Sequence, residues 1–123
     1  MPALMAQIGD QAVASGAGVK GAYVQLIAAT PRAYYGILVK LRCAAFANDF
    51  DFFVDIAVGA GGAEQVIAAN VHLKYHMIAA PASTFENGSI VYVPVFIPDG
   101  SRVSARAQSP AVNPVQVTVE GAY

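Results

Sequence analysis

The sequence predicts an all-β fold, an antiparallel two-sheet sandwich that is jelly-roll-like and carries an N-terminal arm. From residue 22 onward, β-branched and aromatic residues gather in short runs, which is typical of strands. Glycine, proline, asparagine and aspartate separate these runs, as turns require. No stretch has the apolar spacing of a long amphipathic helix. Eight short strands without such a helix favour two packed sheets in one domain of 123 residues.

Residues 1–21 are predicted to form the N-terminal arm, and residues 22–123 the β-sandwich domain. The first segment is rich in alanine and glycine, and its glycines work against a long stable helix. A short helix near residues 3–14 is the alternative, but its small side chains offer little apolar area to hold it on a core. We therefore expect the arm to lie on a neighbouring subunit.

The predicted strands follow one another with turn residues between them. The clearest turn is Pro98-Asp99-Gly100, because an Asp-Gly pair favours a tight hairpin between its flanking strands. Both faces of the run 91–97 are apolar, so this strand is expected to be covered on both sides. The expected strands are 22–29, 35–46, 50–58, 64–69, 71–78, 89–97, 102–108 and 114–120, with one neighbouring pair a candidate for merging.

Composition points to a protein whose surface is shielded by other protein. Apolar residues make up 56% of the chain and charged residues only 12%, about half the roughly 25% usual for soluble domains. The formal net charge of −1 lacks the basic excess that binds nucleic acid or an anionic membrane, so neither is an expected partner. Large apolar patches on soluble proteins mark interfaces. We therefore expect a homo-oligomer.

Aspartates on one side of a predicted strand are the first candidate site. Asp49, Asp51 and Asp55 share one face, but side chains that project side by side from a strand do not wrap a calcium ion as a loop does. Asp51, Asp55 or Glu64 is instead expected to pair with an arginine within or between subunits. The arginines in question are Arg102 and Arg106. These two arginines and the three carboxylates are the candidate interface residues: Asp51, Asp55, Glu64, Arg102 and Arg106.

The sequence contains no recognisable catalytic or metal-binding motif. His72 and His76 share a strand face but stand about 13 Å apart at the usual strand rise, too far to hold one metal ion. The stretch Gly59-Ala60-Gly61-Gly62 follows a strand but is not continued by a helix, so it indicates a turn and not a phosphate site. We expect a protein that is not an enzyme and has no metal, no cofactor and no catalytic residues.

Three segments resemble small β-sandwich virion proteins of tailed bacteriophages. They are residues 34–40 (YYGILVK), 54–64 (VDIAVGAGGAE) and 97–108 (IPDGSRVSARAQ). The resemblance covers about residues 30–120 and consists of strand and turn patterning. It implies a non-enzymatic building block that decorates the head or belongs to the neck or tail, assembled as a symmetric ring or trimer. It also implies other virion proteins as partners and localisation in the virion after synthesis in the bacterial host cytoplasm.

A carbohydrate-binding adhesin module is the alternative function, because jelly rolls present loops or a concave face to sugars. Aromatic side chains would stack on the sugar, and an amide would bind its hydroxyl groups. The candidate residues are Tyr34, Tyr35, Asn87 and Tyr92.

Overall fold

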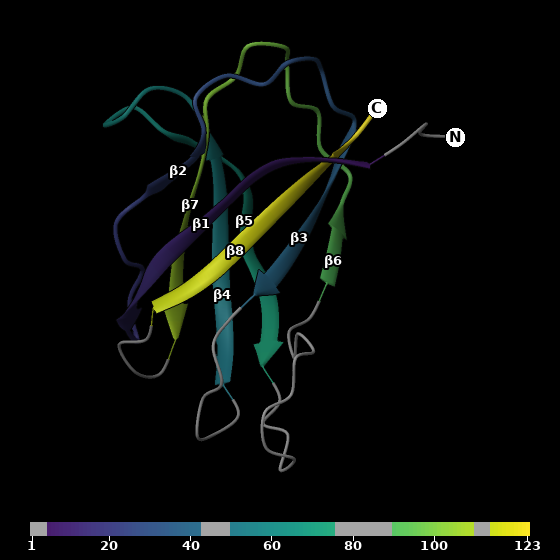
Figure 1. The fold of residues 1–123 in the computed structure, drawn as a ribbon. Helices are drawn as coiled ribbons and strands as arrows, with labels where there is room; N and C mark the ends of the chain where they lie inside the picture. The colour runs from purple at the N-terminus through teal and green to yellow at the C-terminus, as the bar shows by residue number, and fades with distance from the viewer. Residues whose placement is uncertain (1–4, 43–49, 76–89, 110–113) are drawn as a thin grey trace.

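The computed structural model describes residues 5–42, 50–75, 90–109 and 114–123, and within them the regular structure is all β-strand (Figure 1). No helix in these ranges is long and apolar enough to cross a membrane. The strands are β1 (Met5–Ala17), β2 (Val24–Ile27), β3 (Gly36–Arg42), β4 (Phe50–Val58), β5 (Gln65–Tyr75), β6 (Ile90–Val93), β7 (Val103–Ser109) and β8 (Pro114–Ala122).

The pairing of these strands is that of a rolled antiparallel ribbon. β1 pairs with β8, β2 with β7, β3 with β6 and β4 with β5, all antiparallel. Pairing of β3 with β8 and of β4 with β7 then closes the roll into two sheets, in the orders β1-β8-β3-β6 and β2-β7-β4-β5. Figure 1 shows the first sheet lying across the second. The expected two-sheet sandwich is confirmed, and its strand order is that of a jelly roll.

The core lies between the two inner faces. Alternate residues of each strand point inward, so Ile37 and Val39 of β3 meet Phe52 and Val54 of β4 across the sandwich with no exposed surface. The other fully enclosed members of the core include Ile56, Leu73, Ile97, Val103, Ala105, Ala107, Val117 and Val119. Burial of this apolar surface is the main favourable contribution to folding.

The N-terminal segment departs from the predicted arm. Residues 5–17 form β1, which pairs with β8 from Met5 to Ala14 and then runs parallel to β7 from Ser15 to Ala17. β1 is therefore a strand of the chain's own sandwich and links its two sheets. The backbone supplies the ladder hydrogen bonds, so an alanine- and glycine-rich segment gains them without the large side chains by which strands are recognised.

The predicted strands 64–69 and 71–78 correspond, as far as the structure describes them, to one strand, β5, with an irregularity at its middle. Val54 of β4 faces Val71, whereas Ile56 faces Ala68, so β5 has an extra residue opposite Asp55. Asn70 lies in this bulge with a φ of 51°, a conformation that asparagine tolerates better than most residues. The bulge leaves the Asn70 amide free to bond elsewhere.

The predicted hairpin around Pro98-Asp99-Gly100 is wrong, although the turn itself forms. β6 pairs with β3, and β7 pairs with strands of the other sheet, so the turn carries the chain between sheets. Thr30 holds it there: its hydroxyl donates to the Pro98 carbonyl (2.9 Å) and accepts from the Ser101 amide (3.0 Å). The turn residues made the chain reverse at Pro98-Asp99-Gly100. The hydrogen bonds to Thr30, in the β2–β3 connection, then directed the chain into the other sheet.

The expectation that the run 91–97 is covered on both faces is also wrong. β6 ends at Val93, before Pro94, and lies at the end of its sheet. Ile90, Tyr92 and Phe96 are 60%, 49% and 54% exposed. Proline cannot donate to a ladder, which explains the short edge strand.

Gly121 of β8 is required by the packing of Tyr34. A Cβ atom on Gly121 would overlap the ring of Tyr34, which is 1% exposed. We therefore expect Gly121→Ala to lower the free energy of unfolding by about 1–3 kcal/mol, because the ring must leave its position in the core. Urea denaturation measures this change.

Gly61→Ala is the matched control, since the nearest atom to a Cβ there is 4.0 Å away on Arg102. Equal stability losses in the two variants would contradict the assigned packing of Tyr34.

Candidate functional site

Asp55 is a buried carboxylate on the outer face of the β2-β7-β4-β5 sheet. Only 3% of the residue is exposed. Lys20 Nζ and the Asn70 backbone N–H donate to its Oδ1, each at 2.9 Å, and Arg106 Nε donates to its Oδ2 at 2.9 Å. These donors come from the β1–β2 connection, the β5 bulge and β7. One carboxylate therefore ties three segments to β4.

The donors decide the charge state of Asp55. Burial by itself raises the pKa of this carboxyl, but the hydrogen bonds from the Asn70 amide, Lys20 and Arg106 outweigh burial and hold the pKa below its ordinary value of 3.8. Lys20 Nζ also donates to Asn70 Oδ1 at 2.6 Å, and the Arg106 guanidinium lies 4.6 Å from the centre of the Tyr23 ring. The Asp55 carboxyl is therefore ionised, and both of its oxygens accept hydrogen bonds from groups of the same chain.

The predicted arginine–carboxylate pairs are present in part. Arg106 pairs with Asp55 within the chain, directly across the β4–β7 ladder. Arg102 instead donates to Gln25 Oε1 (2.8 Å) and to the Gly59 carbonyl (3.0 Å). Glu64 accepts from the Gly62 amide. The part that these residues play between subunits stays a prediction.

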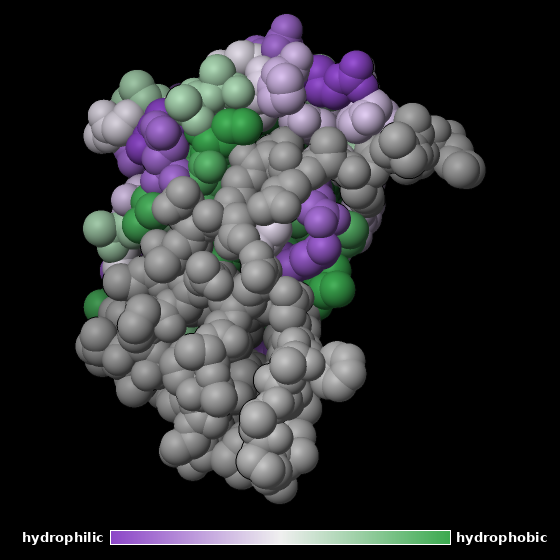
Figure 2. All heavy atoms as spheres, viewed as in Figure 1, coloured by the Kyte–Doolittle hydropathy of each residue, from purple (hydrophilic) through white to green (hydrophobic). Residues whose placement is uncertain are grey.

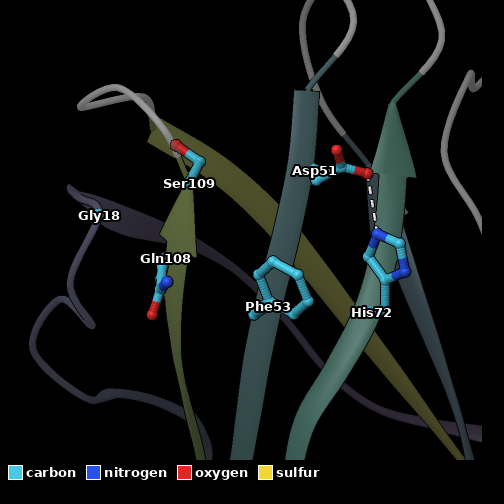
Figure 3. Close-up of a pocket in the computed structure, with 6 residues that line it drawn as sticks. All are labelled: Gly18, Asp51, Phe53, His72, Gln108 and Ser109. Atoms are coloured by element: carbon cyan, nitrogen blue, oxygen red, sulfur yellow. Dashed lines mark hydrogen bonds and ion pairs between the residues drawn. The ribbon is translucent and has the colours of Figure 1, made fainter.

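A pocket of about 350 Å³ lies farther along the same outer face (Figure 3). It forms where β5 and β7 end and β4 begins, next to the end of β1. We call it the Phe53 pocket, and its lining residues are Gly18, Asp51, Phe53, His72, Gln108 and Ser109. Its volume is at the lower end of the range of about 300–1,000 Å³ that small-molecule sites occupy.

Aromatic and polar groups meet in the Phe53 pocket. The Phe53 ring stacks on the His72 ring with centroids 4.9 Å apart and planes 14° from parallel. His72 Nε2 and Asp51 Oδ1 form a hydrogen bond of 2.8 Å. Figure 3 shows Phe53 between Gln108 and His72, with Asp51 nearer the start of β4. The register places Phe53 opposite both His72 and Gln108, so the cross-strand pairs create this arrangement.

The sequence motifs did not reveal this pocket. Asp51 was expected to pair with an arginine, and His72 was considered only as a metal ligand and set aside. The available signal was Phe53, a large apolar residue between Asp51 and Asp55 on the outward side of β4. Gln108 and Ser109 gave no signal, because only the β4–β7 register brings them beside Phe53.

Within residues 5–42, 50–75, 90–109 and 114–123, no group of three or more His, Cys, Asp or Glu side chains is placed to hold a metal ion. Asp51 bonds to His72, and Asp55 bonds to cationic side chains and an amide. Asp49 and His76 lie outside the described residues.

The predicted glycan residues separate into buried and exposed ones. Tyr34 is 1% exposed and packs in the core, so it cannot stack on a sugar, which corrects that expectation. Tyr35 and Tyr92 are 67% and 49% exposed. Asn87 lies outside the described residues.

Exposed apolar side chains gather at one edge of the β1-β8-β3-β6 sheet. Tyr35 and Phe96 contact one another with ring centroids 5.3 Å apart, and Tyr92 lies over Gly36, the neighbour of Tyr35. Figure 2 shows apolar atoms at the edge where β6 runs. We call this set the β6 edge patch, and it consists of Tyr35, Ile90, Tyr92 and Phe96.

Replacing Asp55 by asparagine tests the charge of the buried cluster. We expect Asp55→Asn to lower the free energy of unfolding at neutral pH by about 2 kcal/mol, because hydrogen bonds to a charged group are stronger than neutral ones. In the parent protein the folded-state pKa is the lower one, so the contribution is complete well above pH 3.8 and is lost as the pH falls through the folded-state value.

Urea denaturation of both proteins across this pH range measures the effect. The difference in stability should shrink on acidification, whereas Asp99→Asn, in an exposed turn, should change stability little at any pH. A difference that does not vary with pH would show that Asp55 is not held ionised by its donors.

The chain matches no protein-family model, no curated protein and no solved structure.

Proposed function

We propose that this protein is a non-enzymatic structural subunit of a tailed-phage virion, a head decoration or a neck or tail component. In this proposal it acts by symmetric association with copies of itself, a trimer being one such form, and by docking on other virion proteins. It is made in the bacterial host cytoplasm and resides in the virion. The observation that carries the proposal is the β6 edge patch.

The patch has the character of an interface between proteins. It holds four of the six large apolar residues that are exposed in the described part of the chain, and the other two are Val19 and Val66. Clustering of this kind on a soluble protein marks an association surface, whereas scattered exposed apolar residues are ordinary. Tyrosine and phenylalanine are also the residues enriched in such surfaces.

The position of the patch on a sheet edge supports the same proposal. Among the strands that the structure describes, β6 is the last of its sheet, and none of its residues, Ile90–Val93, is charged. Isolated proteins protect edges with charged side chains, bulges or covering segments. Lys40, which lies opposite Ile90 in the β3–β6 register, pairs with Glu120 at 2.7 Å within the sheet. A second copy would cover the apolar edge.

The resemblance of residues 34–40, 54–64 and 97–108 to small virion proteins supports the choice of assembly. Two of these segments border the patch, because they contain Tyr35 and adjoin Phe96. The carbohydrate-binding alternative that relied on Tyr34, Tyr35, Asn87 and Tyr92 is weaker, since Tyr34 is enclosed.

A charge on the β6 edge should break the association. We expect the parent protein to sediment as an oligomer at micromolar concentration and Ile90→Asp to weaken association by at least about tenfold, because a buried carboxylate would lack a partner. Analytical ultracentrifugation over a concentration series measures this. Val66→Asp, at an exposed apolar position of β5, is the control.

A parent protein that is monomeric at all concentrations tested would refute assembly through this edge. Equal weakening by Ile90→Asp and Val66→Asp would place the contact elsewhere.

The virion location is tested on particles. Gold-labelled antibody against this chain should decorate purified phage at a repeated, symmetric set of positions in negative-stain images. Particles that lack the chain in immunoblots would contradict the assignment to a virion.

A further inference from the structure

We propose that the side chains of Lys20 and Asn70 become joined by an amide bond within the folded chain, with Asp55 as the proton acceptor. The bond is an intramolecular cross-link between the β1–β2 connection and β5, and it does not depend on the proposed assembly. The observation behind it is the contact of a primary amine, a carboxamide and a carboxylate in one cluster.

Lys20 supplies the amine, and the fold holds this amine against both other groups. Its Nζ donates to Asn70 Oδ1 at 2.6 Å and to Asp55 Oδ1 at 2.9 Å. Only 17% of the Lys20 side chain is exposed, so the amine is largely shielded from water. An amine held in contact with an amide reacts as though it were at a very high local concentration.

The β5 bulge presents Asn70 to the amine. Asn70 has a φ of 51°, and its backbone N–H donates to Asp55 Oδ1 at 2.9 Å. The backbone and the side chain of one residue therefore both contact the cluster, which fixes the carboxamide beside Lys20. Asn70 is also exposed to solvent, so ammonia released from its side chain has a route out of the protein.

Asp55 is the base that the reaction needs. An ammonium group is not a nucleophile until it loses a proton, and the Asp55 carboxylate contacts the Lys20 ammonium directly. Burial raises the pKa of Asp55, but the hydrogen bonds from the Asn70 amide, Lys20 and Arg106 hold that pKa low and keep the carboxylate ionised. A carboxylate with a low pKa is a weak base, so we expect a reaction that takes hours and occurs once in each molecule.

The step balances without an oxidant or a cofactor. The Lys20 ammonium gives one proton to Asp55, and the resulting amine attacks Asn70 Cγ to form the new carbon–nitrogen bond. Asp55 passes that proton to Asn70 Nδ2 as the bond between Cγ and Nδ2 breaks, and ammonia leaves. A second proton from the attacking nitrogen leaves with the ammonia as ammonium. Asp55 returns to the carboxylate, and no atom is oxidised or reduced.

A bond between Lys20 and Asp55 is the competing product, and charge disfavours it. An ionised carboxylate resists attack by a nucleophile, whereas a neutral carboxamide has a carbonyl carbon open to attack. The two products differ in mass, because a bond to Asn70 releases ammonia, about 17 Da, and a bond to Asp55 releases water, about 18 Da.

The test is the mass of the purified full chain after incubation in the folded state at mildly alkaline pH for about a day. We expect most molecules to lose about 17 Da. Trypsin should then release a branched peptide that joins residues 1–32 to residues 43–74, because cleavage after the acylated Lys20 is blocked. The same incubation in concentrated urea should leave the mass unchanged, since the cluster exists only in the folded chain.

Variants assign the bond to the three groups. Lys20→Arg keeps a positive charge beside Asp55 without a primary amine and should retain its full mass. Asn70→Asp keeps the shape of the side chain but has no ammonia to release. Asp55→Asn should slow the mass loss by at least about tenfold, and Lys20→Arg serves if that variant fails to fold. Lys40→Arg, in the ion pair with Glu120, should lose about 17 Da like the parent.

Any of four results would overturn the inference. They are a parent chain that keeps its full mass, a loss of about 18 Da with a branch at Asp55, a loss of ammonia that maps to a succinimide in a linear peptide, and an equal loss of ammonia in Lys20→Arg. The oligomeric state enters none of these measurements, so the cross-link and the proposed function are tested separately.

Discussion

The buried carboxylate of Asp55 is the interaction on which the course of the chain between the sheets depends. It lies on β4 and receives hydrogen bonds from Lys20 of the β1–β2 connection, from the Asn70 amide of the β5 bulge and from Arg106 of β7. A buried charge is costly unless it is paired, so Lys20, the Asn70 amide and Arg106 must stay beside the carboxylate in the folded protein. Lys20 thereby fixes the connection that brings the chain from β1 in one sheet to β2 in the other.

The two outer faces of the sandwich differ in the side chains that they carry. On the β2-β7-β4-β5 sheet, Asp55 is paired with cationic side chains of the same chain, and the Phe53 pocket lies farther along that face. The β1-β8-β3-β6 sheet instead ends in exposed apolar side chains at Ile90 and Tyr92. Assembly is therefore proposed through the β1-β8-β3-β6 sheet.

The strand β1 explains why a segment of small residues belongs to the sandwich. Without it, β8 would present an unpaired edge from Pro114 to Ala122, and the two sheets would not be joined through Ser15–Ala17 and β7. An open edge of nine residues would be available to pair with other chains. The segment contributes backbone hydrogen bonds along this edge, a role for which residue size matters little.

The sequence by itself determined the fold class, because strand-forming runs, turn residues and alternation such as Val117 and Val119 inward are local properties of neighbouring residues. The sequence pattern also placed Asp55 and Arg106 on predicted strands and indicated that a carboxylate and an arginine of this set would pair. Only the tertiary structure decided that the Asp99-Gly100 turn crosses between sheets, that β1 is a strand, and that Phe53 meets His72 and Gln108 in one pocket. Those outcomes depend on which strands become neighbours and in what register, and these follow from packing the whole chain around one core.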